Sequence, residues 1–289
     1  MLEYKARPDE VNKFFNKGYQ TQNGVTFSGG DEKSKFFASY QNVHNNGIIP
    51  NDKFDRNTFR LNASRELGRL TAGINASYSQ SDVNATSNLD QASSIYWGLI
   101  NTTVMAPLTS YKDWRTNKFA NPNGYYNAFY QNPYFLIDNN RTRDKRNTVQ
   151  GNVDLSYKVT DYLRANYRLG TTSISQNSLV TQDKFTYDKY TQDHNTNKSG
   201  TGVNGYVQDL ASSFTRINSD LFLSLDKTFG DITVQAILGN NVQQTDSRFN
   251  SVSSTALATP ACSTSATASV TWVAATAAPK RVCTPSTPT

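Results

Sequence analysis

LTAGINASY, residues 70–78, alternates between two kinds of side chain. Leucine, alanine, isoleucine and tyrosine occupy the even positions, and threonine, glycine, asparagine and serine occupy the odd ones. A repeat of two is that of a β-strand with one apolar and one polar face, whereas a helix would need repeats of three and four. The same alternation recurs in residues 149–159, 163–169, 221–225 and 232–238.

From this pattern we predict eight strands. They are residues 23–29, 35–43, 54–65, 70–81, 145–158, 162–175, 213–227 and 232–249. A strand that crosses the hydrocarbon of a bilayer at a tilt needs about 9 to 11 residues, whereas ordinary strands average about 5 or 6. The alternating runs are therefore long enough to span a membrane.

The connections between these strands alternate in length. Tight turns are predicted at residues 30–32, 66–69, 160–161 and 229–231, and longer excursions at 44–53, 82–144 and 176–212. Barrels of the bacterial outer membrane have short turns at one rim and long external loops at the other. The fold class that this predicts is all-β, an antiparallel transmembrane β-barrel segment with long external loops.

Composition agrees with this fold class. The chain has 289 residues, of which 36% are hydrophobic, 12% aromatic and 18% charged. No run approaches eighteen apolar residues, so no transmembrane helix is predicted and only a barrel could span. Aromatic residues lie at strand ends, where rings favour the membrane interface, although aromatics also favour strands in general. They are Tyr40, Phe54, Phe59, Tyr78, Tyr157, Tyr162, Phe229 and Phe249.

The net charge of +6 is spread along the chain, with one local cluster at Arg141, Arg143, Lys145 and Arg146. We interpret the cluster as the solvated base of a loop; contact with anionic lipid headgroups at the rim is the alternative. No nucleic-acid partner is expected, because the basic residues form no recognised binding motif.

Several segments, in this order, resemble the barrel region of SusC/RagA-type TonB-linked outer-membrane proteins, across about residues 10 to 250. The segments are FFNKG at 14–18, VTFSGG at 25–30, SY at 39–40, GIIPN at 47–51, DRN at 55–57, NASYS at 75–79 and NPY at 132–134.

The resemblance implies a parent barrel of about 22 strands with a plug in its lumen, located in the outer membrane of a Gram-negative cell and contacting its lipid. It further implies import of oligosaccharides or peptides, powered by the TonB complex through an N-terminal TonB box and assisted by a SusD-like surface lipoprotein. No signal sequence, plug or TonB box is recognisable here, so we expect the chain to be a fragment that does not transport by itself. The alternatives are a passive porin or adhesin barrel and a soluble glycan-binding β protein.

Two regions are predicted: a partial receptor barrel at 1–250 and a low-complexity tail at 251–289. In the tail, 29 of 39 residues are Ser, Thr, Ala or Pro. We expect it to be disordered, as a shifted reading frame would produce; a mucin-like stalk is the alternative. Both cysteines, Cys262 and Cys283, lie within it.

No catalytic, cofactor-binding or metal-binding residues are predicted, and we expect no enzyme activity. The two histidines, His44 and His194, lie in separate predicted loops without a partner at ligand spacing. Carboxylates that might be imagined as calcium ligands lack the calcium-loop pattern and are interpreted as solvated loop charges. They are Asp52, Asp55, Asp183, Asp188 and Asp193.

The excursion at 82–144 is the richest candidate for ligand binding. It begins with a possible short helix at 93–100 and carries Tyr96, Trp97 and Trp114. These three are the candidate substrate-binding residues, since exposed aromatic faces stack on sugar rings. Packing of the aromatics within the loop is the favoured alternative, because a long ordered loop needs a core of its own.

Overall fold

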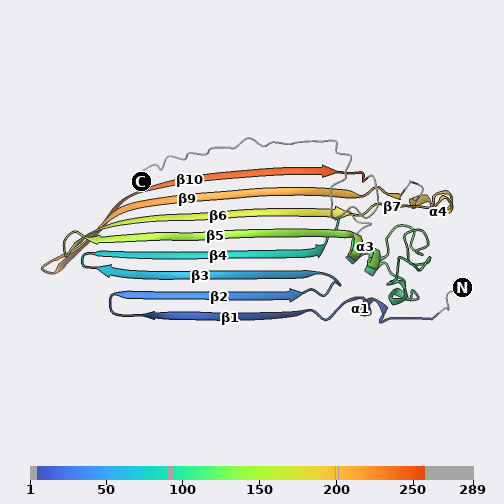
Figure 1. Ribbon diagram of the computed structural model, residues 1–289, viewed down its shortest axis with the longest axis horizontal. Helices are drawn as coiled ribbons and strands as arrows, with labels where there is room; N and C mark the ends of the chain where they lie inside the picture. The colour runs from blue at the N-terminus through green and yellow to red at the C-terminus, as the bar shows by residue number, and fades with distance from the viewer. Residues whose placement is uncertain (1–4, 90–93, 199, 201, 258–289) are drawn as a thin grey trace.

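The computed structural model describes residues 5–89, 94–198, 200 and 202–257. Strands make up 60% of it, and the fold class is all-β. Eight long strands form one antiparallel sheet in the order β1-β2-β3-β4-β5-β6-β9-β10 (Figure 1). Their bounds are β1 Tyr19–Gly30, β2 Ser34–Asn46, β3 Lys53–Leu67, β4 Leu70–Thr86, β5 Asn140–Lys158, β6 Leu163–Gln182, β9 Tyr206–Phe229 and β10 Ile232–Ser254.

All eight predicted strands are present, and most extend beyond their predicted ends. β9 begins at Tyr206, seven residues before the prediction, and β6 continues through Gln182. At these ends polar and apolar side chains follow one another without a period of two, so alternation disappears while the hydrogen-bonded register continues. β10 likewise runs on to Ser254, into the first residues of the predicted tail; residues 258–289 lie outside the described residues.

Three glycines shape the predicted tight turns. Gly68 and Gly230 have φ of 61° and 59°, and each opens a two-residue turn whose second residue has negative φ. That combination is the type II′ turn, whose twist matches the twist of paired strands. Gly30, with φ of 157°, ends β1 before the turn that Asp31 closes by accepting hydrogen bonds from the amides of Lys33 and Ser34.

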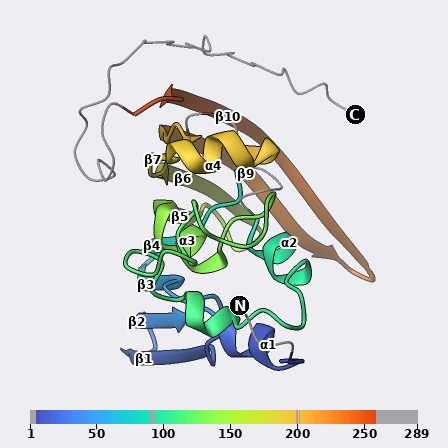
Figure 2. The same ribbon diagram turned by 90° about the vertical axis from the view of Figure 1, so that its right-hand side faces the viewer.

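All the helices lie at the opposite end of the sheet from the tight turns (Figures 1 and 2). They are α1 Glu10–Phe14, α2 Ile95–Ile100, η1 Leu108–Tyr111, α3 Pro133–Asn139, α4 Lys189–His194 and η2 Thr196–Lys198. A small hairpin of β7 Phe185–Thr186 and β8 Gly202–Val203 joins them. We call the described parts of residues 5–18, 47–52, 87–139 and 183–205 the cap. The predicted segregation of long connections to one end is therefore confirmed.

Within the described chain no helix is long and apolar enough to cross a membrane. The longest, α3, has seven residues. The predicted short helix at 93–100 is present as α2, which Ser94 caps.

Candidate functional site

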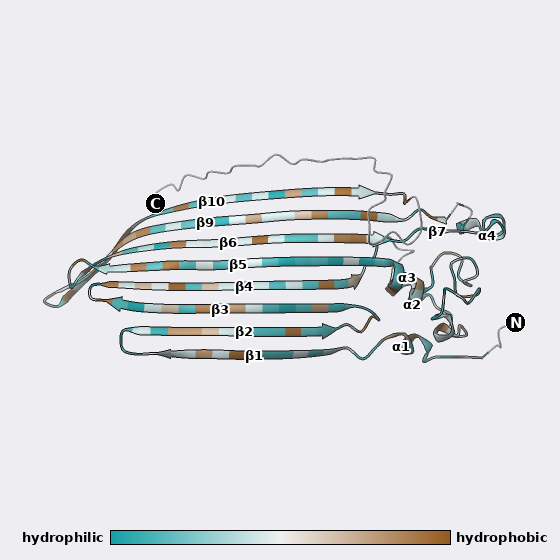
Figure 3. Cartoon of the chain, viewed as in Figure 1, coloured by the Kyte–Doolittle hydropathy of each residue, from teal (hydrophilic) through white to brown (hydrophobic). Residues whose placement is uncertain are grey.

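One face of the sheet exposes apolar side chains on all eight strands. The register sets them side by side; Ile74, for example, lies between Ala63 on β3 and Val153 on β5. Figure 3 shows hydrophobic and hydrophilic residues following one another along the strands. The exposed large members of this face include Val25, Phe27, Phe36, Phe59, Leu61, Ile74, Tyr78, Val149, Val153, Leu155, Leu169, Leu221, Leu223 and Leu238. We call this the apolar face. Soluble monomers rarely expose a continuous apolar surface of such extent, so this face requires lipid or a protein partner.

The opposite face carries polar and charged side chains that bond across the strands. Asn166 accepts a hydrogen bond from Ser156 at 2.8 Å and donates one to Ser224 at 3.1 Å. Arg168 donates to Asp154 on the neighbouring strand. Asp154, Ser156, Asn166 and Arg168 border a shallow hollow of about 480 Å³. This polar face is built for contact with water or a polar ligand.

Aromatic residues mark both borders of the apolar face. On the cap side, Tyr40, Phe59 and Tyr78 lie in one row across β2, β3 and β4, and the Tyr40 and Phe59 ring centroids are 4.7 Å apart. On the turn side, the Lys227 Nζ lies 4.2 Å from the ring centroid of Tyr162 and 4.8 Å from that of Phe229. Aromatic rings at two borders, with a cation beside them, are typical of membrane interfaces.

The height of the apolar face suits a bilayer. From the start of β4 at Leu70 to the aromatic row at Tyr78, the strand rises roughly 27 Å at about 3.4 Å per residue. At the tilt of about 35–45° found in outer-membrane barrels, that length covers roughly 20 Å of membrane. The apolar band of such barrels is about 25 Å tall, so the two dimensions are comparable.

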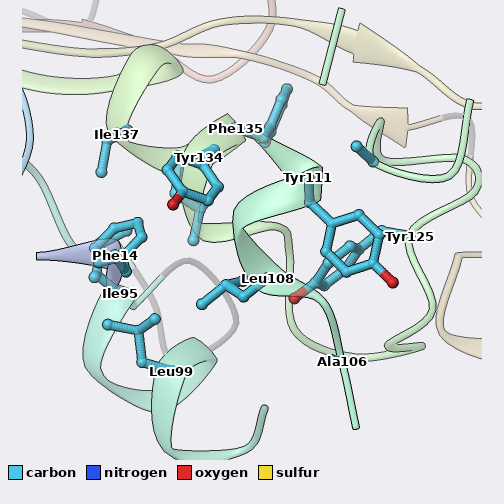
Figure 4. Packing of buried hydrophobic residues seen from close by; sticks show 12 residues of the cluster. Phe14, Ile95, Leu99, Ala106, Leu108, Tyr111, Tyr125, Tyr134, Phe135 and Ile137 are labelled. Carbon is cyan, nitrogen blue, oxygen red and sulfur yellow. The ribbon is translucent and has the colours of Figure 1, made fainter. Parts of the chain in front are cut away.

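The cap has its own hydrophobic core, drawn in Figure 4. The Phe14 ring, from the N-terminal segment, packs edge-on against Tyr134 of α3 with centroids 5.0 Å apart. Asn132, which is fully buried, organises the centre: its Nδ2 donates to the carbonyls of Tyr111 at 2.9 Å and Ala120 at 2.8 Å, and its Oδ1 accepts from the Tyr134 amide. The long loops therefore form an ordered unit at the end of the sheet.

Glu10 ties the N-terminal helix to this unit. Its Oε2 accepts hydrogen bonds from the Thr109 amide at 2.8 Å and from the Thr109 hydroxyl at 2.7 Å, and its Oε1 lies 3.3 Å from the Lys13 Nζ. The bonds from Thr109 stabilise the carboxylate and lower the pKa of Glu10 below its ordinary value. A group with a lowered folded pKa contributes stability above its unfolded pKa and loses that contribution as the pH falls.

We expect Glu10→Gln to destabilise the cap by about 2 kcal/mol near pH 7, the scale of hydrogen bonds to a charged group. The difference from the wild type should shrink as the pH falls below about 4.5 and through the lowered folded pKa. Hydrogen exchange of the Thr109 amide at several pH values measures the loss of stability and its dependence on pH. Lys13→Gln is the control and should change protection little, because the Lys13 side chain is mostly exposed. A pH-independent difference would contradict the assignment.

The structure separates the three predicted binding residues. Trp114 packs within the cap: its indole nitrogen donates to Asp138 at 2.8 Å and its ring meets Phe135 edge-on at 5.0 Å. Tyr96 and Trp97, on α2, are 64% and 42% exposed and form an edge-to-face pair with centroids 5.4 Å apart. The arrangement favours packing for Trp114 and leaves Tyr96 and Trp97 available to a ligand.

The interpretation of the basic cluster as a solvated loop base is wrong for Arg141. The interpretation of Asp52 as a solvated loop charge is also wrong. Arg141 is buried at the start of β5, where its guanidinium donates to Asp52 at 3.0 Å, to Asn84 at 2.7 Å and to the carbonyls of Asn51 and Ile137. The Asp52 Oδ1 also accepts from the amide and hydroxyl of Thr86. This junction joins β4, β5 and the 47–52 loop. The remaining members, Arg143, Lys145 and Arg146, are exposed but lie on a strand.

His44 is also corrected, because it lies in β2 and not in a loop. Its Nδ1 is 2.6 Å from the Asp55 Oδ1 on the neighbouring strand, and its Nε2 is 3.0 Å from the Asn46 Nδ2. Asp55 is therefore a cross-strand partner and not a solvated loop charge. His194, at the end of α4, stacks on Tyr190 with centroids 4.2 Å apart.

The other three carboxylates lie in the cap. Asp188 caps α4 by accepting from the Thr191 amide at 2.7 Å, and Asp193 pairs with Lys189. Asp183 is half-buried, and burial raises its pKa. Among the described residues, no three His, Cys, Asp and Glu side chains gather as a metal-binding group.

Sequence reasoning missed two buried polar residues. Asn132 is the N-cap of α3, and Pro133 is its first residue. Asn followed by Pro is a typical helix start, so this signal was present in the sequence. Lys198 is buried with its Nζ 2.9 Å from the Pro122 carbonyl, and burial lowers its pKa to about 8. No sequence signal indicates burial of a lysine in a polar loop.

No protein-family model matches the chain, and no curated protein matches it in sequence. Solved structures do match in fold. A RagAB peptide importer in its closed-closed state superimposes with a TM-score of 0.63 at 14% identity, over 88% of this chain and 27% of that one. Its open-open state gives 0.64 at 15% identity, over 94% and 29%, and a RagAB peptide transporter gives 0.63 at 15%, over 86% and 27%. The chain thus spans under a third of the length of each matched chain.

Proposed function

We propose that this chain is a barrel segment of an outer-membrane, TonB-dependent importer of the SusC/RagA type. The observation that carries the proposal is the two-faced sheet: strands of 12 to 24 residues with one face mainly apolar from the turns to the aromatic row, the other polar, and long connections at one end. Such a sheet suits a wall between lipid and an aqueous lumen.

Each part of the molecule then has a role. The apolar face contacts outer-membrane lipid, the polar face lines the lumen, and the cap stands at the external mouth. Further strands pair with the open edges of β1 and β10 to complete a barrel of about 22, since an unpaired strand edge is costly in lipid. We assign residues 1–254 to the barrel segment, because β10 ends at Ser254, and residues 255–289 to a tail.

At 14–15% identity, the likeness to RagAB structures shows a shared fold. Because those structures are of an importer, we prefer an importer to a passive barrel. Those structures are of a peptide importer, so peptides or oligosaccharides are the proposed cargo, with a SusD-like lipoprotein and the TonB complex as partners.

Tyr96 and Trp97 are the proposed cargo-contacting side chains. Substitution of both by alanine should then weaken retention of peptide or oligosaccharide by the vesicle-bound chain, and unchanged retention would count against them.

The test asks whether the 289-residue chain needs lipid to fold. Unfolded chain is diluted into buffer or into phosphatidylcholine vesicles, and strand content and protease resistance of residues 19–254 are measured. We expect both to appear with vesicles, where the open edges of β1 and β10 can pair between copies of the chain, and aggregation to occur in buffer, because the apolar face is uncovered in water. A monomer that folds in buffer alone would overturn the proposal.

A further inference from the structure

Beyond the aromatic row, the apolar face changes character in successive rows toward the cap. The register places them two residues apart along β2, β3, β4 and β5. In order they are Asn42, Asn57, Gln80 and Asn147; then His44, Asp55, Asp82 and Lys145; then Asn46, Lys53, Asn84 and Arg143. The surface therefore passes from rings to amides to charges, the order of chemistry met on leaving a bilayer.

The amide row is joined to the rings below it. The Tyr40 hydroxyl donates to the Asn57 Oδ1 at 2.7 Å, and the Tyr78 hydroxyl donates to the Asn147 Oδ1 at 2.9 Å. These bonds hold the rings with their polar ends toward the cap. The two charged rows follow at roughly 13 and 20 Å along the strand from the ring row. Strand tilt reduces that height, and long Lys and Arg side chains extend back toward an interface.

Three cations in these rows have no partner within the described chain. Lys53, Arg143 and Lys145 are exposed, and their side chains make no hydrogen bond or ion pair with described residues. Lys53 and Arg143 flank Asn84 in the register, with about 10 Å between their Cα atoms at two strand spacings. All three line one shallow hollow of about 370 Å³.

The carboxylates of the same hollow limit what it can hold. Asp82 lies beside Lys145 in the register, and Asp209 lies two strands from Arg143. Asp55 is held by His44, and Asp144 accepts a hydrogen bond from Gln176 at 2.8 Å. The direct cross-strand neighbours of Lys53 and Arg143 are neutral: Asn46 and Asn84 for the first, Asn84 and Leu179 for the second.

We propose that Lys53 and Arg143, with Lys145 on the membrane side, bind the phosphate of one anionic lipid headgroup. Two cations that flank a neutral amide, with neutral side chains as their direct cross-strand neighbours, suit a single phosphate. The site rests on the proposed function, in which this face of the sheet contacts lipid. It adds a defined headgroup site on the outer wall, separate from the lumen and the cap.

The test compares binding of the 289-residue chain to vesicles of phosphatidylcholine alone and to vesicles with phosphatidylglycerol added, by flotation. The variant Lys53→Gln/Arg143→Gln should lose roughly tenfold to thirtyfold of the preference for phosphatidylglycerol, since each cation near an anionic surface contributes about 1 kcal/mol. The wild-type preference should weaken in high salt.

The matched control is Arg56→Gln/Arg146→Gln. Arg56 and Arg146 occupy the same two strands, flank Ser81 in the register about 10 Å nearer the aromatic row, and belong to the opposite, polar face. The control should keep the preference. Equal losses in both variants, or no wild-type preference in chain that inserts normally, would overturn the headgroup site alone. Failure to insert into phosphatidylcholine vesicles would instead overturn the proposed function.

Discussion

Ile74→Arg should weaken insertion of the chain into phosphatidylcholine vesicles by roughly 30-fold to 700-fold. Ile74 lies midway along β4 between Leu70 and the aromatic row at Tyr78, with its side chain exposed on the apolar face. Arginine on the lipid side of a barrel at the bilayer midplane costs about 2–4 kcal/mol, and each 1.4 kcal/mol is a factor of ten. Partitioning between vesicles and urea-containing buffer measures the change.

Asn75→Arg is the matched control, because it adds the same side chain one residue away on the polar face. Asn75 lies between Asn62 and Asn152 in the register. There the new guanidinium remains in a polar environment, so partitioning should change by less than about threefold. Equal effects of the two substitutions would mean that the apolar face is not the membrane-facing one.

Arg141→Met should destabilise the junction between the cap and the sheet by about 3–5 kcal/mol. Its guanidinium, which is 90% buried, pairs with Asp52 and donates to two main-chain carbonyls. Removal of one member of a buried ion pair leaves the other charged and desolvated, which is the costly case. Hydrogen exchange of the amides of Thr86 and Ser87, followed with increasing urea, reports the opening of this junction.

Two further variants identify the cause. Arg143→Met, two residues along the same strand, removes an exposed guanidinium without a described partner and should change stability by less than about 0.5 kcal/mol. Arg141→Met combined with Asp52→Asn should recover part of the loss, since the unpaired carboxylate is gone. A junction as stable in Arg141→Met as in Arg143→Met would contradict the role assigned to Arg141.

Alternation is informative only where the two faces of a strand meet different environments. It located the middle of every long strand, including residues 70–78, where one face is apolar. At the cap-side ends of β2 and β5 both faces are polar, so His44 was placed in a loop although it pairs across the sheet with Asp55. For the same reason, alternation did not predict that β5 begins at Asn140, and the burial of Arg141 could not be predicted either.

The cap was less predictable than the sheet. The short helix predicted at 93–100 is present as α2. A long ordered loop needs a core, which favoured packing of Trp114, and in the structure Trp114 packs against Phe135. Contacts between Phe14 and Tyr134, or between Glu10 and Thr109, join segments about a hundred residues apart. No local pattern encodes such pairs.

The eight strands, their two faces and the end with the long connections could be predicted from sequence, because period-two alternation and glycine turns are local properties of the chain. The folded chain was needed to show which polar residues are buried, which described cations lack a partner, and how rings, amides and charges line up in rows across strands. Those features depend on register and on contacts between distant segments, since burial and pairing are set by what the folded chain brings beside a residue and not by its neighbours in sequence.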